Sequence, residues 1–163
     1  MAKARERCWR WVLDLDIKGF FDSIDWELLL KAVRQHTYCA WVLLYIKRWL
    51  KASVQMEDGR VVPRQAGTPQ GGVISPLLAN LFLHYALDKW MAREFPHIPF
   101  ERYADGLICH CRTEEDARAL WRAIADRFAA CKLVLHPETT KIVHCKDVNR
   151  RGDHPDIHFD FPG

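Results

Sequence analysis

The segment FERYADGLICHC, residues 100–111, constrains the fold more than any other stretch of this sequence. Phe100–Ala104 and Leu107–Cys111 are two extended runs joined by Asp105 and Gly106. An Asp-Gly pair between two such runs is the strongest short signal for a β-hairpin. Because glycine tolerates a positive φ, the sequence predicts that Gly106 supplies the turn conformation and that the two runs are antiparallel neighbours.

A second extended segment, Arg10–Ile17, alternates apolar and polar positions. One face carries Trp11, Leu13, Leu15 and Ile17, and the other face carries Val12, Asp14 and Asp16. This pattern predicts a strand that packs on one side and carries acids on the opposite side.

Helix signals fill the rest of the chain. Asp25 is a candidate N-cap for a helix to about His36, and a second apolar helix covers about residues 40–51. Ser75 as N-cap and Pro76 at the first helical position predict a long apolar helix from there through Glu94. Thr113, with an acid three residues later, predicts a further helix to about Cys131.

The remaining extended segments complete the pattern. Residues 133–135 and 141–145 form an extended pair, and the EDGR turn predicts a small hairpin within residues 54–62. The principal order is strand, helices, strand, strand, helix, strand. This order predicts an α+β fold of the ferredoxin-like split βαβ type with an inserted small hairpin.

Length and composition narrow the class of protein. The 163 residues fit one domain, and no apolar run is long enough to span a membrane. The charge balance, 24 Lys and Arg against 21 Asp and Glu, gives +3, which permits a nucleic-acid partner without arguing for one. The N-terminus lacks a secretory apolar region and the six cysteines form no CxxC pair, so we expect reduced thiols in the cytoplasm.

The acids suggest chemistry and leave alternatives open. Asp16 lies where a predicted buried strand meets a loop, where a divalent cation, an ion pair with Lys18 or Arg102, or plain solvent exposure would offset its charge. If the first strand borders the hairpin, Asp16 and Asp105 converge on one edge and form a clamp suited to in-line phosphoryl transfer. Structural zinc at Cys109, His110 and Cys111 is a further alternative to thiols that pack in the core.

Four stretches resemble consecutive motifs of reverse transcriptases, most closely the bacterial group II intron-encoded, maturase-type branch. They are DIKGFFDSID (16–25), GTPQGGVISPLLANLFLH (67–84), RYADG (102–106) and LHPETTK (135–141). The resemblance implies a polymerase palm that acts as an RNA-directed DNA polymerase. It further implies two Mg²⁺ ions, with Mn²⁺ as an acceptable substitute, and a bacterial cytoplasmic protein. The implied partners are an RNA template, a DNA primer, dNTPs and intron RNA, with no membrane.

The resemblance also implies roles at the metal site. Asp16 and Asp105 correspond to the catalytic aspartates, and the backbone carbonyl of Ile17 is a further expected metal ligand. Tyr103 corresponds to a residue that supports the hairpin near the primer end.

Further implied roles concern the nucleotide and the template. Phe21 corresponds to the aromatic steric gate under the incoming sugar, although an ordinary core aromatic would have the same sequence. Gln70 and Gly71 correspond to the nucleotide-binding loop, and Gly72 to its primer and template side. Lys141 is expected to contact the triphosphate, because Thr139 stands where the family usually carries lysine.

The chain departs from the family pattern in ways that bear on activity. The family motif reads Tyr-Ala-Asp-Asp, and Gly106 replaces its second aspartate. We therefore expect reduced rather than abolished metal binding, and polymerase activity between impaired and absent. The family's fingers and thumb motifs do not occur in residues 1–163, so we expect a single palm domain that is a fragment. The alternative is a non-catalytic RNA-binding remnant.

Overall fold

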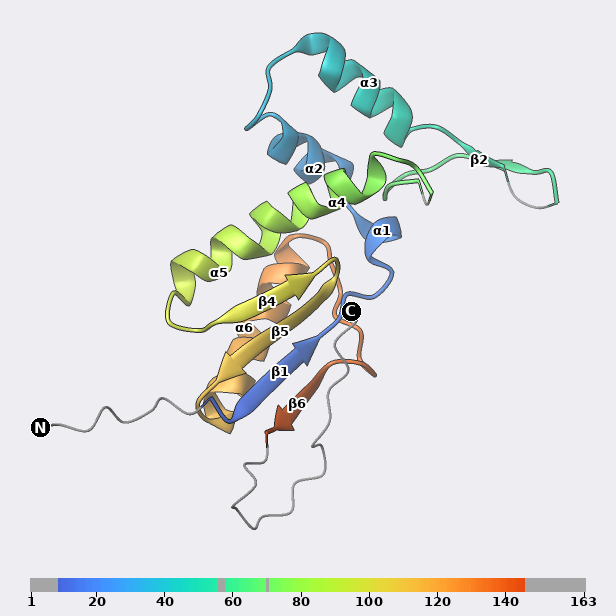
Figure 1. Ribbon diagram of the computed structural model, residues 1–163. Coiled ribbons are helices and arrows are strands. Elements are labelled where there is room, and N and C mark those ends of the chain that lie inside the picture. Colours follow the sequence, from blue (N-terminus) through green and yellow to red (C-terminus); the bar gives the residue numbers. More distant parts are fainter. Residues whose placement is uncertain (1–8, 56–57, 70, 146–163) are drawn as a thin grey trace, which may run out of the picture.

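The computed structural model describes residues 9–55, 58–69 and 71–145 (Figure 1). Four strands form an antiparallel sheet: β1 (Trp11–Leu15), β4 (Phe100–Tyr103), β5 (Gly106–Cys111) and β6 (Lys141–His144). A separate two-stranded ribbon consists of β2 (Val54–Gln55) and β3 (Val61–Val62). The helical segments are α1 (Phe20–Ser23), α2 (Trp26–Val33), α3 (Ala40–Leu50), α4 (Ser75–Leu83), the π-helix η1 (His84–Asp88), α5 (Lys89–Glu94) and α6 (Glu114–Ala130).

The sheet has the strand order β4-β5-β1-β6, and every neighbouring pair is antiparallel. Strand β5 therefore lies between β1 and β4, which run parallel to each other. This arrangement places the end of β1 beside the β4–β5 turn, as the sequence predicted. The molecule is a mixed helix-and-strand fold built on an antiparallel sheet.

One face of the sheet carries most of the core. Leu13 and Leu15 of β1 pack in a single apolar cluster with residues of α4, η1 and α6, including Leu87 and Phe128. In Figure 1, α6 lies behind the sheet and α4, η1 and α5 follow one another as a single long helix. The opposite face holds a smaller buried cluster of Val12, Ile108 and Val143. The alternation predicted for the first strand is thus confirmed for its core side.

The arm formed by α3 and the β2–β3 hairpin extends away from the sheet (Figure 1). The predicted small hairpin is confirmed, since Val54 pairs with Val62 and Gln55 with Val61. Large side chains of α3 and of the residues just before it are exposed: Tyr38, Trp41 and Tyr45.

Two predicted helix caps are confirmed. The Asp25 carboxylate accepts a hydrogen bond from the Leu28 amide at 3.0 Å, and the Thr113 hydroxyl accepts one from the Asp116 amide at 3.0 Å. Helix α2 nevertheless ends at Val33, short of the predicted His36.

The predicted serine cap is wrong. Ser75 is already the first residue of α4, and Ile74 occupies the cap position without a side-chain hydrogen bond. The Ser75 hydroxyl instead donates to the Pro69 carbonyl, which closes the loop before the helix. The serine that the sequence indicates as a helix cap therefore makes a hydrogen bond within the preceding loop instead.

The β4–β5 turn also differs from the prediction. Its loop consists of Ala104 and Asp105, and Gly106 is the first residue of β5, paired with Tyr103. The positive φ falls on Ala104 (φ 52), whereas Gly106 is not among the positive-φ glycines of the described residues. The turn is centred one residue earlier than the Asp-Gly signal indicates, so the backbone at position 106 has no conformational need for glycine.

The predicted extended segment at 133–135 is reduced to a single bridge. Leu135 bridges Ile17 in antiparallel fashion and forms no strand with β6. Within the described residues, no helix is both long enough and apolar enough to cross a membrane.

Candidate active site

Asp16 follows β1 directly and is fixed on three sides. Its Oδ1 accepts a hydrogen bond from the Ile17 amide at 2.9 Å, and its Oδ2 faces the Thr139 hydroxyl at 3.4 Å. Its backbone carbonyl accepts a hydrogen bond from the His136 amide at 2.8 Å. The 135–140 loop therefore holds Asp16 at the end of the sheet.

Asp105 lies in the neighbouring β4–β5 turn and is half-buried. Burial raises the pKa of its carboxyl group, a hydrogen bond from its own backbone amide partly opposes this, and the negative charge of Asp16 raises the pKa further. Leu15 of β1 pairs with Leu107 of β5, so Asp16 and Asp105 lie at the same end of the sheet, and the charge of Asp16 disfavours ionisation of Asp105. The fold brings together the two acids that the sequence singled out.

The donor set suits a hard divalent cation. Carboxylate and carbonyl oxygens are the ligands that Mg²⁺ prefers. The backbone carbonyl of Ile17 can add such an oxygen. The two hydrogen bonds of the Ile17–Leu135 bridge are made by the neighbouring residues: the Lys18 amide donates to the Val134 carbonyl, and the Asp16 carbonyl accepts from the His136 amide. In the part of the chain that the structure describes, no cluster of three or more His, Cys, Asp or Glu side chains could hold a metal. The assignment of Asp16 and Asp105 as the carboxylate ligands of such a cation stays a prediction.

Lys141 lies beside Asp14 rather than at the carboxylate pair. It occupies the β6 position opposite Asp14 of β1, and its Nζ lies 4.0 Å from Asp14 Oδ2. Thr139, in the family's lysine position, is the residue that reaches Asp16. The role expected for Lys141 at a triphosphate stays a prediction.

Phe21, expected as a steric gate, lies on the short helix α1 and is half-buried, with its ring centroid 5.6 Å from that of Phe20. Its backbone carbonyl accepts a hydrogen bond from the Thr68 amide at 2.7 Å. Gly67 sits against the same segment with φ 79, and a Cβ there would lie 2.6 Å from the Phe21 carbonyl oxygen. Only glycine fits at position 67, a requirement that sequence reasoning missed.

The two later glycines of the loop differ from each other. Gly71 has φ 77, and a Cβ added there would meet nothing within 4 Å, so its backbone is open to a ligand. A Cβ on Gly72 would instead lie 2.6 Å from the ring of Trp49, so Gly72 is also required by packing within the chain. Gln70 lies outside the described residues.

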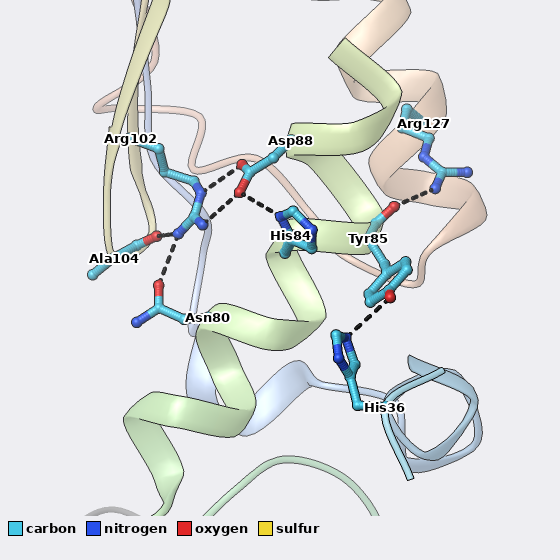
Figure 2. A network of polar contacts seen from close by, with 8 residues as sticks. All are labelled: His36, Asn80, His84, Tyr85, Asp88, Arg102, Ala104 and Arg127. Atoms are coloured by element: carbon cyan, nitrogen blue, oxygen red, sulfur yellow. Dashed lines mark hydrogen bonds and ion pairs between the residues drawn. The ribbon is translucent and has the colours of Figure 1, made fainter. Parts of the chain in front are cut away.

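The other candidate groups lie in different surroundings. Tyr103 is 59% exposed on β4, next to the turn. Arg102 pairs with Asp88 rather than with Asp16, and it also donates to Asn80 and to the Ala104 carbonyl, a network shown in Figure 2. Lys18 is exposed. The ion pair between Asp16 and Arg102 considered for the sequence is thus wrong.

The zinc alternative also fails in the described residues. Cys109 and Cys111 are buried in the main core, and burial raises the pKa of Cys111 to about 11. Because successive strand residues point to opposite faces, His110 lies on the other side of the sheet, where it contacts Glu101 at 2.7 Å. The three side chains cannot share one metal ion.

Comparisons with known proteins agree with this geometry. Residues 1–159 match the family described as reverse transcriptase (RNA-dependent DNA polymerase). The chain is 36% identical over 97 residues to the protein YkfC of Escherichia coli (60% of this chain, 23% of that protein). It is 40% identical over 82 residues to the group II intron-encoded protein LtrA of Lactococcus lactis (50% of this chain, 13% of that protein).

Solved structures show the same fold at low sequence identity. An apo telomerase from Candida tropicalis, truncated from its C-terminal domain, superposes with a TM-score of 0.66 at 11% identity, covering 86% of this chain and 31% of that one. A telomerase from Candida albicans in complex with a fragment of telomeric RNA gives a TM-score of 0.63 at 14% identity, covering 91% of this chain and 28% of that one. The chain thus matches less than a third of each of these relatives.

Proposed function

Because this chain belongs to the reverse transcriptase (RNA-dependent DNA polymerase) family, we propose that it is the palm of an RNA-directed DNA polymerase. The strand order β4-β5-β1-β6 supports a ferredoxin-like palm, and we propose that this palm is a single domain assigned to residues 1–163. The observation that carries the proposal is the convergence of Asp16 and Asp105 at one end of the sheet, where the charge of Asp16 adds to the raised pKa of Asp105.

The reaction is transfer of a nucleotide to a primer 3′-hydroxyl, directed by an RNA template. Asp16, Asp105 and the Ile17 carbonyl would hold divalent ions, Mg²⁺ or Mn²⁺, which supply the positive charge that stabilises the transferring phosphate and lowers the pKa of the hydroxyl. Two ions fit the family chemistry, and the missing carboxylate at Gly106 would weaken their retention.

The chain's own groups would position the substrates. The open backbone of Gly71 allows close approach of the dNTP, and Phe21 would pack under the sugar. Tyr103 and Gly72 would lie along the primer and template, with Gln70 at the nucleotide and Lys141 near the triphosphate. Intron RNA is the further partner suggested by similarity to the LtrA protein, and that bacterial relative supports a bacterial cytoplasmic setting.

A primer-extension assay tests the proposal, with an RNA template, a DNA primer, dNTPs and Mg²⁺. The assay uses both the 163-residue chain and a chimera that adds the flanking regions of a group II intron-encoded relative. Gly106→Asp should raise extension at least about tenfold in the chimera, since it restores an oxygen ligand. The strand backbone at position 106 supports tolerance of this change.

Asp16→Asn should abolish extension, whereas Asp126→Asn, on the exposed side of α6, should leave it unchanged. Measurable primer extension that is equal in the Asp16→Asn variant and its parent would disprove the polymerase assignment.

The second candidate is a non-catalytic RNA-binding remnant, which the absence of a carboxylate at Gly106 favours. It predicts that Gly106→Asp gives no extension even in the chimera, while RNA binding is retained in both proteins.

A further inference from the structure

Arg102, on β4, uses its whole guanidinium group in contacts around the turn that carries Asp105. Its Nε and Nη2 each lie 2.8 Å from an oxygen of the Asp88 carboxylate, which makes a bidentate pair. Its Nη1 donates to Asn80 Oδ1 and to the Ala104 carbonyl, both at 2.9 Å. Only 13% of the side chain is exposed, so water competes weakly for these bonds.

The Ala104 contact acts on a strained backbone. Ala104 has φ 52, a conformation that a residue with a Cβ adopts only where the surroundings impose it. Its carbonyl belongs to the peptide that links Ala104 to Asp105. Arg102 therefore holds the peptide plane immediately before the Asp105 carboxylate.

The π-helix η1 explains how one arginine reaches two acceptors on the long helix. Asn80 and Asp88 are eight positions apart, while two α-helical turns take only about 7.2 residues. In an uninterrupted α-helix, Asp88 would be rotated past the side of the helix that Asn80 occupies. The wider turn of a π-helix takes more residues, so η1 cancels part of this rotation. Figure 2 shows Asn80 and Asp88 both pointing toward Arg102.

A second arginine supports η1 from the opposite side. Arg127 of α6 donates from Nε to the Ala86 carbonyl at 2.7 Å and from Nη2 to the Tyr85 carbonyl at 3.1 Å. Both acceptors are backbone groups of the π-helix itself, and Figure 2 shows the contact with the Tyr85 carbonyl. The π-helix is thus fastened to α6 through its backbone and to β4 through the Asp88 side chain.

We propose that Arg102 is a positioning residue for Asp105: it fastens the Ala104–Asp105 turn to Asn80 and Asp88, which η1 aligns for this purpose. What Asp105 then does rests on the proposed function. The fastening of the turn does not, and it is tested without any activity measurement.

Nuclear magnetic resonance of the 163-residue chain in metal-free buffer provides the test. The ¹³C shifts of Ala104 report the sign of its φ, and amide hydrogen exchange at Asp105 and Gly106 reports opening of the turn. Arg102→Met should move the Ala104 shifts toward negative-φ values and accelerate exchange at both amides by at least about tenfold. The control is Arg118→Met, which removes an exposed arginine paired with Glu114 on α6 and should change neither readout.

A conservative variant separates geometry from charge. Arg102→Lys should behave like Arg102→Met, because an ammonium group cannot bridge a carboxylate, an amide and a carbonyl at once. Wild-type Ala104 shifts in Arg102→Lys would show that charge alone suffices and would overturn the proposal.

A lower melting temperature of Arg102→Met with unchanged Ala104 shifts would also overturn it, since the arginine would then only stabilise the fold. If Arg102→Met does not fold, Asn80→Ala decides: it removes one contact and should shift Ala104 in the same direction by a smaller amount, and no shift would overturn the proposal. Failure of primer extension would leave these readouts unaffected.

Discussion

The start of α2 and the β4–β5 turn each hold a half-buried aspartate, and the fold treats the two carboxylates in opposite ways. Burial acts to raise the pKa of Asp25, but hydrogen bonds from Lys132 Nζ at 2.6 Å and from the Leu28 amide outweigh it, so its pKa is lowered. Burial and the charge of Asp16 raise the pKa of Asp105. A carboxylate whose charged form is stabilised by groups of its own chain contributes to the stability of the fold. A carboxylate whose charged form is destabilised by its surroundings is suited to bind an external cation.

The largest expected effect in this comparison is the loss of Asp25. Asp25→Ala removes both the helix cap and the ion pair, so the free energy of unfolding should fall by about 1–2 kcal/mol in urea denaturation. Thr113→Ala removes only a helix cap, because the Thr113 hydroxyl is uncharged and makes no ion pair. It should lower the free energy of unfolding by about 1 kcal/mol. A smaller loss for Asp25→Ala than for Thr113→Ala would contradict the role assigned to Asp25.

The pH dependence of stability should reflect the lowered pKa of Asp25. Because its folded pKa lies below its unfolded pKa of about 3.9, its contribution is complete above that pH and is lost as the pH falls through the folded value. Asn also caps helices, so Asp25→Asn isolates the charge. Unfolding measured from about pH 6 down to about pH 2 should show wild type and variant converging at low pH. A constant difference across this range would argue against the linkage.

Asp105→Asn should change the free energy of unfolding in the opposite direction and by a smaller amount. Its folded pKa lies above the unfolded value of about 3.9, so ionisation above that pH costs the folded state stability. In metal-free buffer at neutral pH the variant should gain less than about 1 kcal/mol, since the turn is partly open to solvent. The gain should vanish as the pH falls below the unfolded value. Destabilisation by this variant would show that the carboxylate has a structural role instead.

The smallest effect on stability is expected from the removal of Lys132, the cation that pairs with Asp25 at the start of α2. The Lys132 side chain is 62% exposed, so Lys132→Met should change the free energy of unfolding less than any other variant in this comparison. A cost close to that of Asp25→Ala would place the contribution of Asp25 in the ion pair rather than in the cap.

Features with local causes were predictable from the sequence. The first strand, the caps at Asp25 and Thr113, and the small hairpin all depend on neighbouring residues, and the structure contains each of them, although the strand ends at Leu15, so Asp14 lies within it and Asp16 follows it. The proximity of Asp16 and Asp105 followed once β1 was expected to border the hairpin. The resemblance to reverse transcriptases is confirmed by the family match.

Features set by distant contacts were not predictable. The Asp-Gly signal located the hairpin but misplaced its turn by one residue; at the observed position Arg102 contacts the Ala104 carbonyl while it also binds Asp88 and Asn80, which lie 14 and 22 positions earlier in the chain. Gly67 needs to be glycine because of a carbonyl 46 positions earlier in the chain, at Phe21. Side chains of β4 and α6 contact the π-helix η1, and the sequence pattern within residues 84–88 does not indicate a π-helix.

The buried thiols of β5 have a consequence for how opening of this fold can be followed. Cys109 and Cys111 lie in the core beneath α6, and burial raises the pKa of both, so at neutral pH they are protonated and unreactive. A thiol reagent can modify them only when the sheet and α6 separate, whereas Cys39, exposed before α3, reacts at once. Cys131 is also buried and would react slowly, so labelling must be followed at Cys109 and Cys111 themselves; there it reports separation of α6 from the sheet, with the fast reaction at Cys39 as an internal standard.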